Sequence, residues 1–149
     1  MSFVRRVSST LMPLALLVVV GVAAPSAQAQ APAGQTAGAA YDTETGQALS
    51  AWDCNTGTVC FWTGFGGTGG RCTWEVADAD WMSGAIKCPS VTAAEVRSVY
   101  NRGTSSAQGV AFYGDTGFTN RIGCTRQGQK GDLTGIRVRS HQWTSSLCD

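Results

Sequence analysis

The stretch Val59–Gly67 reads VCFWTGFGG, and Val110–Phe118 reads VAFYGDTGF. Each begins with a short apolar run that ends in two aromatic residues, passes through a glycine-containing turn and reaches another aromatic. A basic residue and a cysteine follow in both cases: Arg71 and Cys72, then Arg121 and Cys124. Short β-prone runs joined by glycine turns are typical of β-hairpins. The pattern indicates that the chain uses one kind of β-unit twice.

A second, weaker repeat follows each stretch: EVRSV at 95–99 after the first and GIRVR at 135–139 after the second. Helix signals are scarce, and turn clusters recur at short intervals, which favours many short strands. We expect one helical turn at 77–82 and strands near 58–62, 71–76, 96–100, 108–113, 121–125 and 135–140. Two four-strand units that each begin with a hairpin predict an all-β Greek-key sandwich.

The N-terminus has the three parts of an export signal. Arg5 and Arg6 form the positive start, Leu11–Ala24 is an apolar run of 14 residues, and the tripeptide AQA at 27–29 is an A-x-A cleavage site. The apolar run is shorter than the ~20 residues that a bilayer span requires. We therefore expect a signal peptide at residues 1–29 and a secreted, extracellular protein that is not held in a membrane after cleavage.

Residues 30–50 are rich in Ala, Gly, Gln and Thr and carry almost no large apolar side chain. Such a segment buries too little surface to offset the entropy of ordering. We expect a flexible tail at 30–50 and a single domain at 51–149. The formal net charge is +1, with an acidic first half of the domain and a basic second half. A basic half could meet an acidic partner, but this surplus is too small to indicate nucleic-acid binding.

All six cysteines lie in this domain: Cys54, Cys60, Cys72, Cys88, Cys124 and Cys148. An even number in an exported chain predicts three disulfides. The sequence does not choose among the possible pairings; the local choice is Cys54–Cys60, Cys72–Cys88 and Cys124–Cys148. A structural zinc site is disfavoured because the sequence has no C-x-x-C and one histidine.

Catalytic groups are scarce. His141 is the single histidine, and neither G-x-S-x-G nor H-E-x-x-H occurs, so we expect His141 at the surface. Glu75, Asp78 and Asp80 could supply an acidic pair, although a solvated acidic turn is favoured. The glycine-rich stretch at 63–70 lacks the Lys-Ser/Thr ending of a phosphate loop. This inventory predicts that the protein is not an enzyme and uses no cofactor or metal.

Three features together resemble a known family. They are the opening Cys54–Cys60 with its intervening polar turn, the aromatic turn Tyr113–Phe118, and the hydrophobic-Arg pairs at 96–97 and 136–137. These features are similar to those of the secreted actinobacterial proteins grouped as peptidase inhibitor family I36, whose fold is similar to one βγ-crystallin domain. The resemblance covers roughly 54–140. It implies a βγ-crystallin-like sandwich, with Asn120, which tolerates a left-handed conformation, where the family's turn has glycine.

The resemblance also implies a function. The family's inhibitory member blocks extracellular metalloproteinases with a rigid, disulfide-braced loop, so we expect a monomeric protein that binds and inhibits an extracellular peptidase. The bond Cys124–Thr125 is in the position comparable to the reactive bond, although Cys124 could serve only to fix the C-terminus. Many relatives bind calcium before the hydrophobic-Arg strand. The matching runs 90–95 and 130–135 keep only Thr134 of that pattern, which implies no strong calcium site.

The tryptophans support a rival hypothesis. The chain has five: Trp52, Trp62, Trp74, Trp81 and Trp143. We expect most of them in the core, but one that is exposed could stack against a sugar ring. Together with the basic second half, this makes a non-enzymatic module for the cell envelope or for carbohydrate the alternative function.

Overall fold

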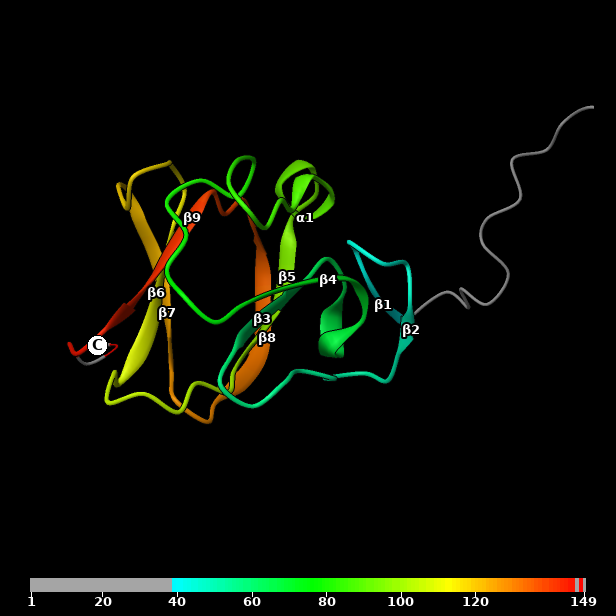
Figure 1. The fold of residues 1–149 in the computed structure, drawn as a ribbon, viewed down its shortest axis with the longest axis horizontal. Helices are drawn as coiled ribbons and strands as arrows, with labels where there is room; N and C mark the ends of the chain where they lie inside the picture. Colours follow the sequence, from blue (N-terminus) through cyan, green and yellow to red (C-terminus); the bar gives the residue numbers. More distant parts are fainter. Residues whose placement is uncertain (1–38, 147, 149) are drawn as a thin grey trace, which may run out of the picture. The chain divides into compact units, whose positions relative to one another are not determined.

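Two β-sheets make up the fold of the computed structural model, which describes residues 39–146 and 148 (Figure 1). The first sheet has the strand order β2-β1-β4-β3-β5-β8 and the second the order β7-β6-β9. The strands are β1 Ala40–Asp42, β2 Ala48–Leu49, β3 Val59–Trp62, β4 Gly69–Trp74, β5 Val96–Asn101, β6 Gly109–Tyr113, β7 Arg121–Arg126, β8 Lys130–Ile136 and β9 Ser140–Thr144. The predicted all-β class is confirmed. The predicted signal peptide lies outside the described residues.

The core lies between the two sheets. Phe61 on β3 and Phe112 on β6 meet edge to face with ring centroids 5.7 Å apart. Trp74 and Trp81 stack at 4.4 Å beside them, and both indoles are buried. Buried aromatic side chains remove large apolar areas from water and dominate the energetics of small cores. Trp62 is also buried, so three of the five tryptophans have the structural role that the sequence predicts.

In each of the two units, the third extended segment pairs with a strand of the other unit instead of its own. β8 follows β6 and β7 in the chain, yet it leaves their sheet and pairs with β5 of the first unit. In return, Asp78 of the first unit forms an isolated bridge with His141 on β9. Each sheet therefore contains backbone from both halves of the chain, and neither unit is complete without the other.

A buried serine holds the hairpin turn of each unit in the same way. Ser98 Oγ donates to the carbonyl of Gly64 at 2.7 Å and accepts the N–H of Gly67 at 3.0 Å. The second unit repeats this arrangement with Ser140, the carbonyl of Asp115 and the N–H of Phe118, at 2.6 and 3.2 Å. Asn120 has φ 58°, the left-handed conformation that the sequence predicts for it.

These serines correct the register of the weaker repeat. The tripeptide Val-Arg-Ser occurs at 96–98 and again at 138–140, and it is these two copies that are structurally equivalent. The single strand predicted at 135–140 is wrong. β8 ends at Ile136 and β9 begins at Ser140, because the chain crosses from the first sheet to the second over the intervening residues. Val138 is buried at this crossing.

The helical prediction is also wrong. The segment 77–82 contains the bridge at Asp78 and then a turn, and the helix lies later, at α1 (Pro89–Ala93). Pairing with β9 satisfies the backbone at Asp78, which a helix at this place would prevent. No described helix is long and apolar enough to cross a membrane.

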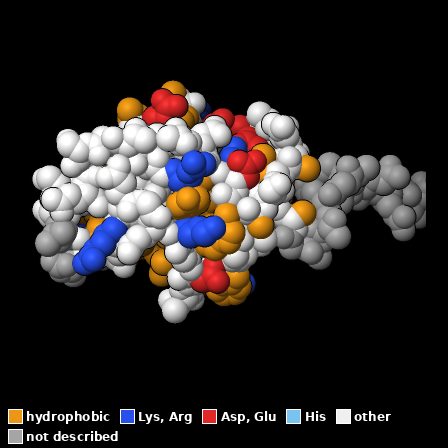
Figure 2. Space-filling view, turned by 90° about the horizontal axis from the view of Figure 1, so that it is seen from below, with side chains coloured by type: hydrophobic (Ala, Val, Ile, Leu, Met, Phe, Trp, Pro, Cys, Tyr) orange, Lys and Arg blue, Asp and Glu red, His pale blue; other side chains and the backbone are white. Residues whose placement is uncertain are grey.

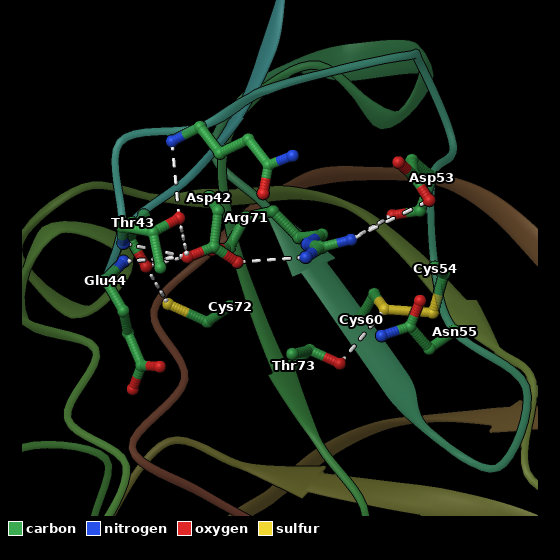
Figure 3. Close-up of polar contacts among 12 residues, drawn as sticks. Asp42, Thr43, Glu44, Asp53, Cys54, Asn55, Cys60, Arg71, Cys72 and Thr73 are labelled. Atoms are coloured by element: carbon green, nitrogen blue, oxygen red, sulfur yellow. Dashed lines mark hydrogen bonds and ion pairs between the residues drawn. A yellow bond between two sulfur atoms is a disulfide. The ribbon is translucent and has the colours of Figure 1, made fainter.

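The flexible tail predicted at 30–50 does not hold for residues 40–49. β1 pairs in parallel with β4, and β2 folds back on β1. Asp42 on β1 forms an ion pair of 2.9 Å with the buried Arg71 on β4, whose Nη1 also donates to the carbonyl of Asp53 (Figure 3). Backbone pairing and this ion pair order the segment. The prediction was wrong here because it considered only the burial of apolar side chains, of which the segment has few.

Three disulfides tie the fold together. They join Cys54 to Cys60, Cys72 to Cys88, and Cys124 to Cys148, which are the local pairs named above. The first closes the loop before β3, the second joins β4 to the start of α1, and the third fixes the C-terminal end to β7. No cysteine is free among the described residues.

Candidate functional site

The segment predicted to carry the reactive bond is a strand at the edge of the second sheet. β7 pairs with β6 on one side and has no strand on the other in the described structure. Ile122 on this strand is 37% exposed and is one of four large apolar side chains that are exposed among the described residues. Cys124 is partly buried and bound to Cys148. The bond Cys124–Thr125 thus lies within extended backbone, and Thr125 is buried opposite Val110.

A cleft of about 360 Å³ opens beside this bond. It lies between β7 of the second sheet and β8 of the first, and each of these strands is at the edge of its sheet. Its lining consists of Val99, Cys124, Thr125, Gln129, Lys130, Gly131, Asp132 and Leu133. The position of the cleft leaves one side of the candidate strand open to another chain.

Asn101, at the end of β5, braces the turn that joins β7 to β8. Its side-chain amide donates to the carbonyl of Thr125 at 3.0 Å and accepts the N–H of Gly103 at 2.9 Å. Its backbone donates to the carbonyl of Gln129 at 3.0 Å and accepts the N–H of Gly128 at 2.8 Å. The side chain is fully buried, so these bonds are shielded from water. One residue therefore fixes both ends of the turn at 126–129.

Gln127 adds a second brace from within the turn. Its side-chain amide donates to the carbonyl of Gly103 at 2.5 Å and to that of Ser105 at 3.4 Å. Gly103 is required at this point because a Cβ there would collide with the ring of Trp143. The turn is consequently held from β5 and from the loop that follows it. Nothing in the sequence pattern indicates this bracing.

His141 is not the surface residue that the sequence predicts. Its side chain is fully buried, and burial lowers its pKa to about 4. Nδ1 accepts the indole N–H of Trp81 at 2.9 Å, and Nε2 lies 3.1 Å from the carbonyl of Val76, to which it donates as the neutral tautomer. A neutral ring with both nitrogens engaged is a structural element. It has no free nitrogen to serve as a general base.

The acidic residues near β4 are engaged in structural contacts as well. Asp78 accepts the indole N–H of Trp74 at 2.9 Å and the N–H of Asp80 at 2.8 Å. Asp80 pairs with Arg139 at 2.9 Å, and this hydrogen bond holds the pKa of the Asp80 carboxyl below its ordinary value. No cluster of three metal-ligating side chains occurs among the described residues.

The fold and this site define a small disulfide-bonded β-sandwich with a braced, exposed edge strand. The sequence model of peptidase inhibitor family I36 matches residues 47–125, and the chain belongs to this family. The match includes both hairpins and ends at Thr125, within the candidate strand. No curated protein matches the chain. Membership supports a peptidase inhibitor role with a peptidase as the partner, and both the family and the disulfides are consistent with an extracellular protein.

Proposed function

We propose that this protein is a secreted, monomeric inhibitor of an extracellular metalloproteinase, and that it binds through β7 and the turn at 126–129. The observation that carries the proposal is the combination of family membership with an edge strand that is held at Cys124 and at the turn that follows it. The disulfide Cys124–Cys148 holds the strand, and Asn101 holds the turn that follows it. The resemblance described for the sequence supplies the class of peptidase.

An edge strand suits the way in which peptidases take up extended chains. Its free backbone groups can pair with a strand of the partner, while side chains such as Ile122 enter pockets beside it. A segment that is already ordered loses little conformational entropy on binding. The cleft between β7 and β8 gives the partner's backbone room to approach.

The proposed reactive bond is Cys124–Thr125. Hydrolysis would occur in a strand whose far side still pairs with β6 and whose Thr125 carbonyl is held by Asn101. Both new ends would remain close together, because neither can leave without breaking this pairing. Religation can then compete with release, which is the behaviour of an inhibitor rather than that of a substrate.

The test uses the purified mature protein and a thermolysin-like metalloproteinase. We expect residual peptidase activity to fall as the protein is added, and to stay low at a molar excess. Full residual activity at that excess would contradict the proposal. A serine peptidase assayed in parallel distinguishes a metalloproteinase inhibitor from one of wider range.

A matched pair of variants locates the site. Ile122→Glu places a charge on the exposed edge of β7 and should weaken inhibition at least tenfold. Met82→Glu makes the same change at a residue that is 44% exposed and lies outside the proposed site, so inhibition should be unchanged. Equal effects of the two variants would count against β7 as the binding segment.

The exchange of third segments supports the βγ-crystallin-like fold that the resemblance implies. Each unit contributes a hairpin whose turn folds onto a serine of its own last strand, and each lends its third segment to the other sheet. We assign the domain to this fold on that basis.

Carbohydrate binding is the second candidate function, and one hollow favours it. Trp143 is only partly buried and lines a cavity of about 620 Å³. The remaining lining is mostly polar: Thr56, Gly57, Glu75, Val76, Thr104 and Ser105. An aromatic ring beside hydroxyls and a carboxylate matches the apolar face and hydroxyl rim of a sugar. Retention on chitin or cell wall that is lost in Glu75→Ala would support this function, whereas passage of the wild-type protein through both would reject it.

A further inference from the structure

A group of basic and aromatic side chains covers part of the outer face of the first sheet, beside the proposed inhibitory turn. It consists of Trp52, Tyr100, Arg102 and Lys130, which we call the basic aromatic patch. Lys130 Nζ lies 5.1 Å from the ring of Trp52 and 5.4 Å from that of Tyr100. The guanidinium of Arg102 lies 5.8 Å from the centre of the Tyr100 ring. Figure 2 shows a face of the molecule on which basic side chains lie next to hydrophobic ones.

Trp52 is held in this patch at a cost. Its φ of 63° is in the left-handed region, which a bulky side chain rarely adopts because it is strained there. Its N–H donates to the carbonyl of Gly67, and a side chain at Gly67 would collide with it. The strained backbone places the indole edge to face against Trp62 and Tyr100. Strain of this kind is concentrated where a side chain is positioned for binding.

Lys130 of the patch is exposed, and Arg102 is partly buried. Arg102 donates to the carbonyl of Cys54 at 2.6 Å, and among the described residues neither Arg102 nor Lys130 is paired with a carboxylate. Asp132 is close to Lys130 in the chain, but its carboxylate accepts the N–H of Gly66 at 2.7 Å. The patch therefore presents positive charge over aromatic rings.

The patch is continuous with the proposed inhibitory segment. Lys130 is the first residue of β8 and directly follows the turn at 126–129. Tyr100 is its partner across the sheet and precedes Asn101, which braces that turn. A surface that binds β7 and the turn would therefore reach the patch without any rearrangement of the chain.

We propose that the basic aromatic patch is the second half of the peptidase-binding surface, and that it docks on an acidic rim beside the cleft of the peptidase. The inference rests on the proposed function, because it assigns a partner to the surface next to the same site. Trp, Tyr and Arg are the residue types that dominate binding energy at protein interfaces. Unpaired cations at such a surface mainly increase the rate of association with an acidic partner.

The first test measures association kinetics with the inhibited metalloproteinase at several salt concentrations. Lys130→Glu should slow association at least tenfold and weaken its dependence on salt. Lys87→Glu makes the same change of net charge at an exposed residue away from the patch and should leave the rate within twofold. Wild-type rates for Lys130→Glu, or equal slowing by both variants, would overturn the proposal while leaving inhibition through β7 intact.

The aromatic part of the patch is tested with Trp52→Gly, because glycine adopts the left-handed backbone without strain and so offsets part of the packing lost against Trp62. Circular dichroism of the variant checks that it is folded. We expect faster dissociation of the complex, by about tenfold, with little change in the rate of association. Unchanged dissociation would exclude Trp52 from the surface.

A second measurement does not depend on inhibition. The mature protein is titrated with poly-L-glutamate and followed by NMR. The largest chemical-shift changes should occur at Lys130, Arg102 and the indole N–H of Trp52. The variant Lys130→Glu should remove most of these changes. Shifts centred on other basic residues would overturn the patch as an acidic-partner site. If the wild-type protein inhibits no peptidase but these chemical-shift changes are present, the proposed function is wrong, whereas the patch is still supported as a binding site for an acidic partner.

Discussion

At the scale of single residues, several buried polar side chains form long-range hydrogen bonds, most of which could not be predicted from the sequence. Asn101, His141, Ser98 and Ser140 are all fully buried, and each satisfies backbone or indole groups from distant parts of the chain. The serines could be found from the sequence, because the repeated Val-Arg-Ser tripeptide marks them. His141 could not, since its partners Trp81 and Val76 lie far from it in the sequence and only the fold brings them together.

His141 makes stability depend on pH. Its pKa is about 4 in the fold and about 6.5 in the unfolded chain, so the unfolded chain gains a proton first as the pH falls. The free energy of unfolding should therefore decrease between pH 6.5 and 4, by on the order of 3 kcal/mol, and change no further through this group below pH 4. Urea unfolding across this range measures the effect.

The variant His141→Gln provides the control for this prediction. Glutamine does not titrate, so the decrease between pH 6.5 and 4 should become smaller by about the contribution of the imidazole. A wild-type decrease that persists unchanged in the variant would assign the pH dependence to carboxylates instead.

Asn101 should be essential for the order of the turn at 126–129. Replacement by alanine leaves the carbonyl of Thr125 and the N–H of Gly103 without their partner, which should cost roughly 2–4 kcal/mol. Hydrogen exchange at Gly103 and Gly128 should become faster than elsewhere in the sheet. Gln127→Ala removes the brace from an exposed residue and should have a much smaller effect. Similar effects of the two variants would show that Asn101 is not the main brace.

At the scale of the elements, strands could be predicted where apolar alternation is strong, but their exchange between sheets could not. The strands predicted near 58–62, 96–100, 108–113 and 121–125 agree with β3, β5, β6 and β7 to within a residue or two. The segment 135–140 shows why prediction failed elsewhere. Ile136 and Val138 alternate as in one strand, yet the chain changes sheet between them, and a period of two carries no information about which sheet a residue joins.

The hairpin of β1 and β2 should stabilise the domain through Arg71. Loss of the partner Asp42 would leave a buried guanidinium poorly compensated, so Asp42→Ala should lower the free energy of unfolding by about 3 kcal/mol. A chain that begins at Ala51 should be destabilised at least as much. Chemical denaturation compares both with the chain that begins at Ala39.

The double variant Asp42→Leu/Arg71→Met tests the electrostatic explanation. With both charges replaced by apolar side chains of similar size, stability should return towards that of the wild type. A double variant as unstable as Asp42→Ala would indicate that the hairpin acts through other contacts.

At the scale of the whole molecule, the sequence could indicate which strand carries the candidate site but not the residues that surround it. The resemblance placed the reactive bond at Cys124–Thr125, and the structure places this bond beside a cleft between two sheet edges. The sequence could not show that Thr125 is buried, that Asn101 braces the turn, or that Trp52 and Lys130 meet. These arrangements depend on which faces of the two sheets come together, and that is a property of the complete fold.

The disulfide Cys124–Cys148 predicts the fate of a cleaved molecule. The bond after Cys124 lies inside the loop of 24 residues that this disulfide closes. Cleavage there should produce no separate fragments without reductant, and the intact mass should increase by one water. With reductant, a C-terminal fragment that begins at Thr125 should appear in mass spectrometry. A new N-terminus at any other residue would place the reactive bond elsewhere.

The stacked pair Trp74 and Trp81 gives the molecule an optical signature. Two indoles with ring centroids 4.4 Å apart and planes 24° apart couple their electronic transitions. Such coupling gives paired bands of opposite sign in circular dichroism, and it disappears when the rings separate. The hydrogen bond from Trp81 to His141 links this signal to the buried imidazole. The packing of the core can therefore be followed by circular dichroism of its own indoles, without any added label.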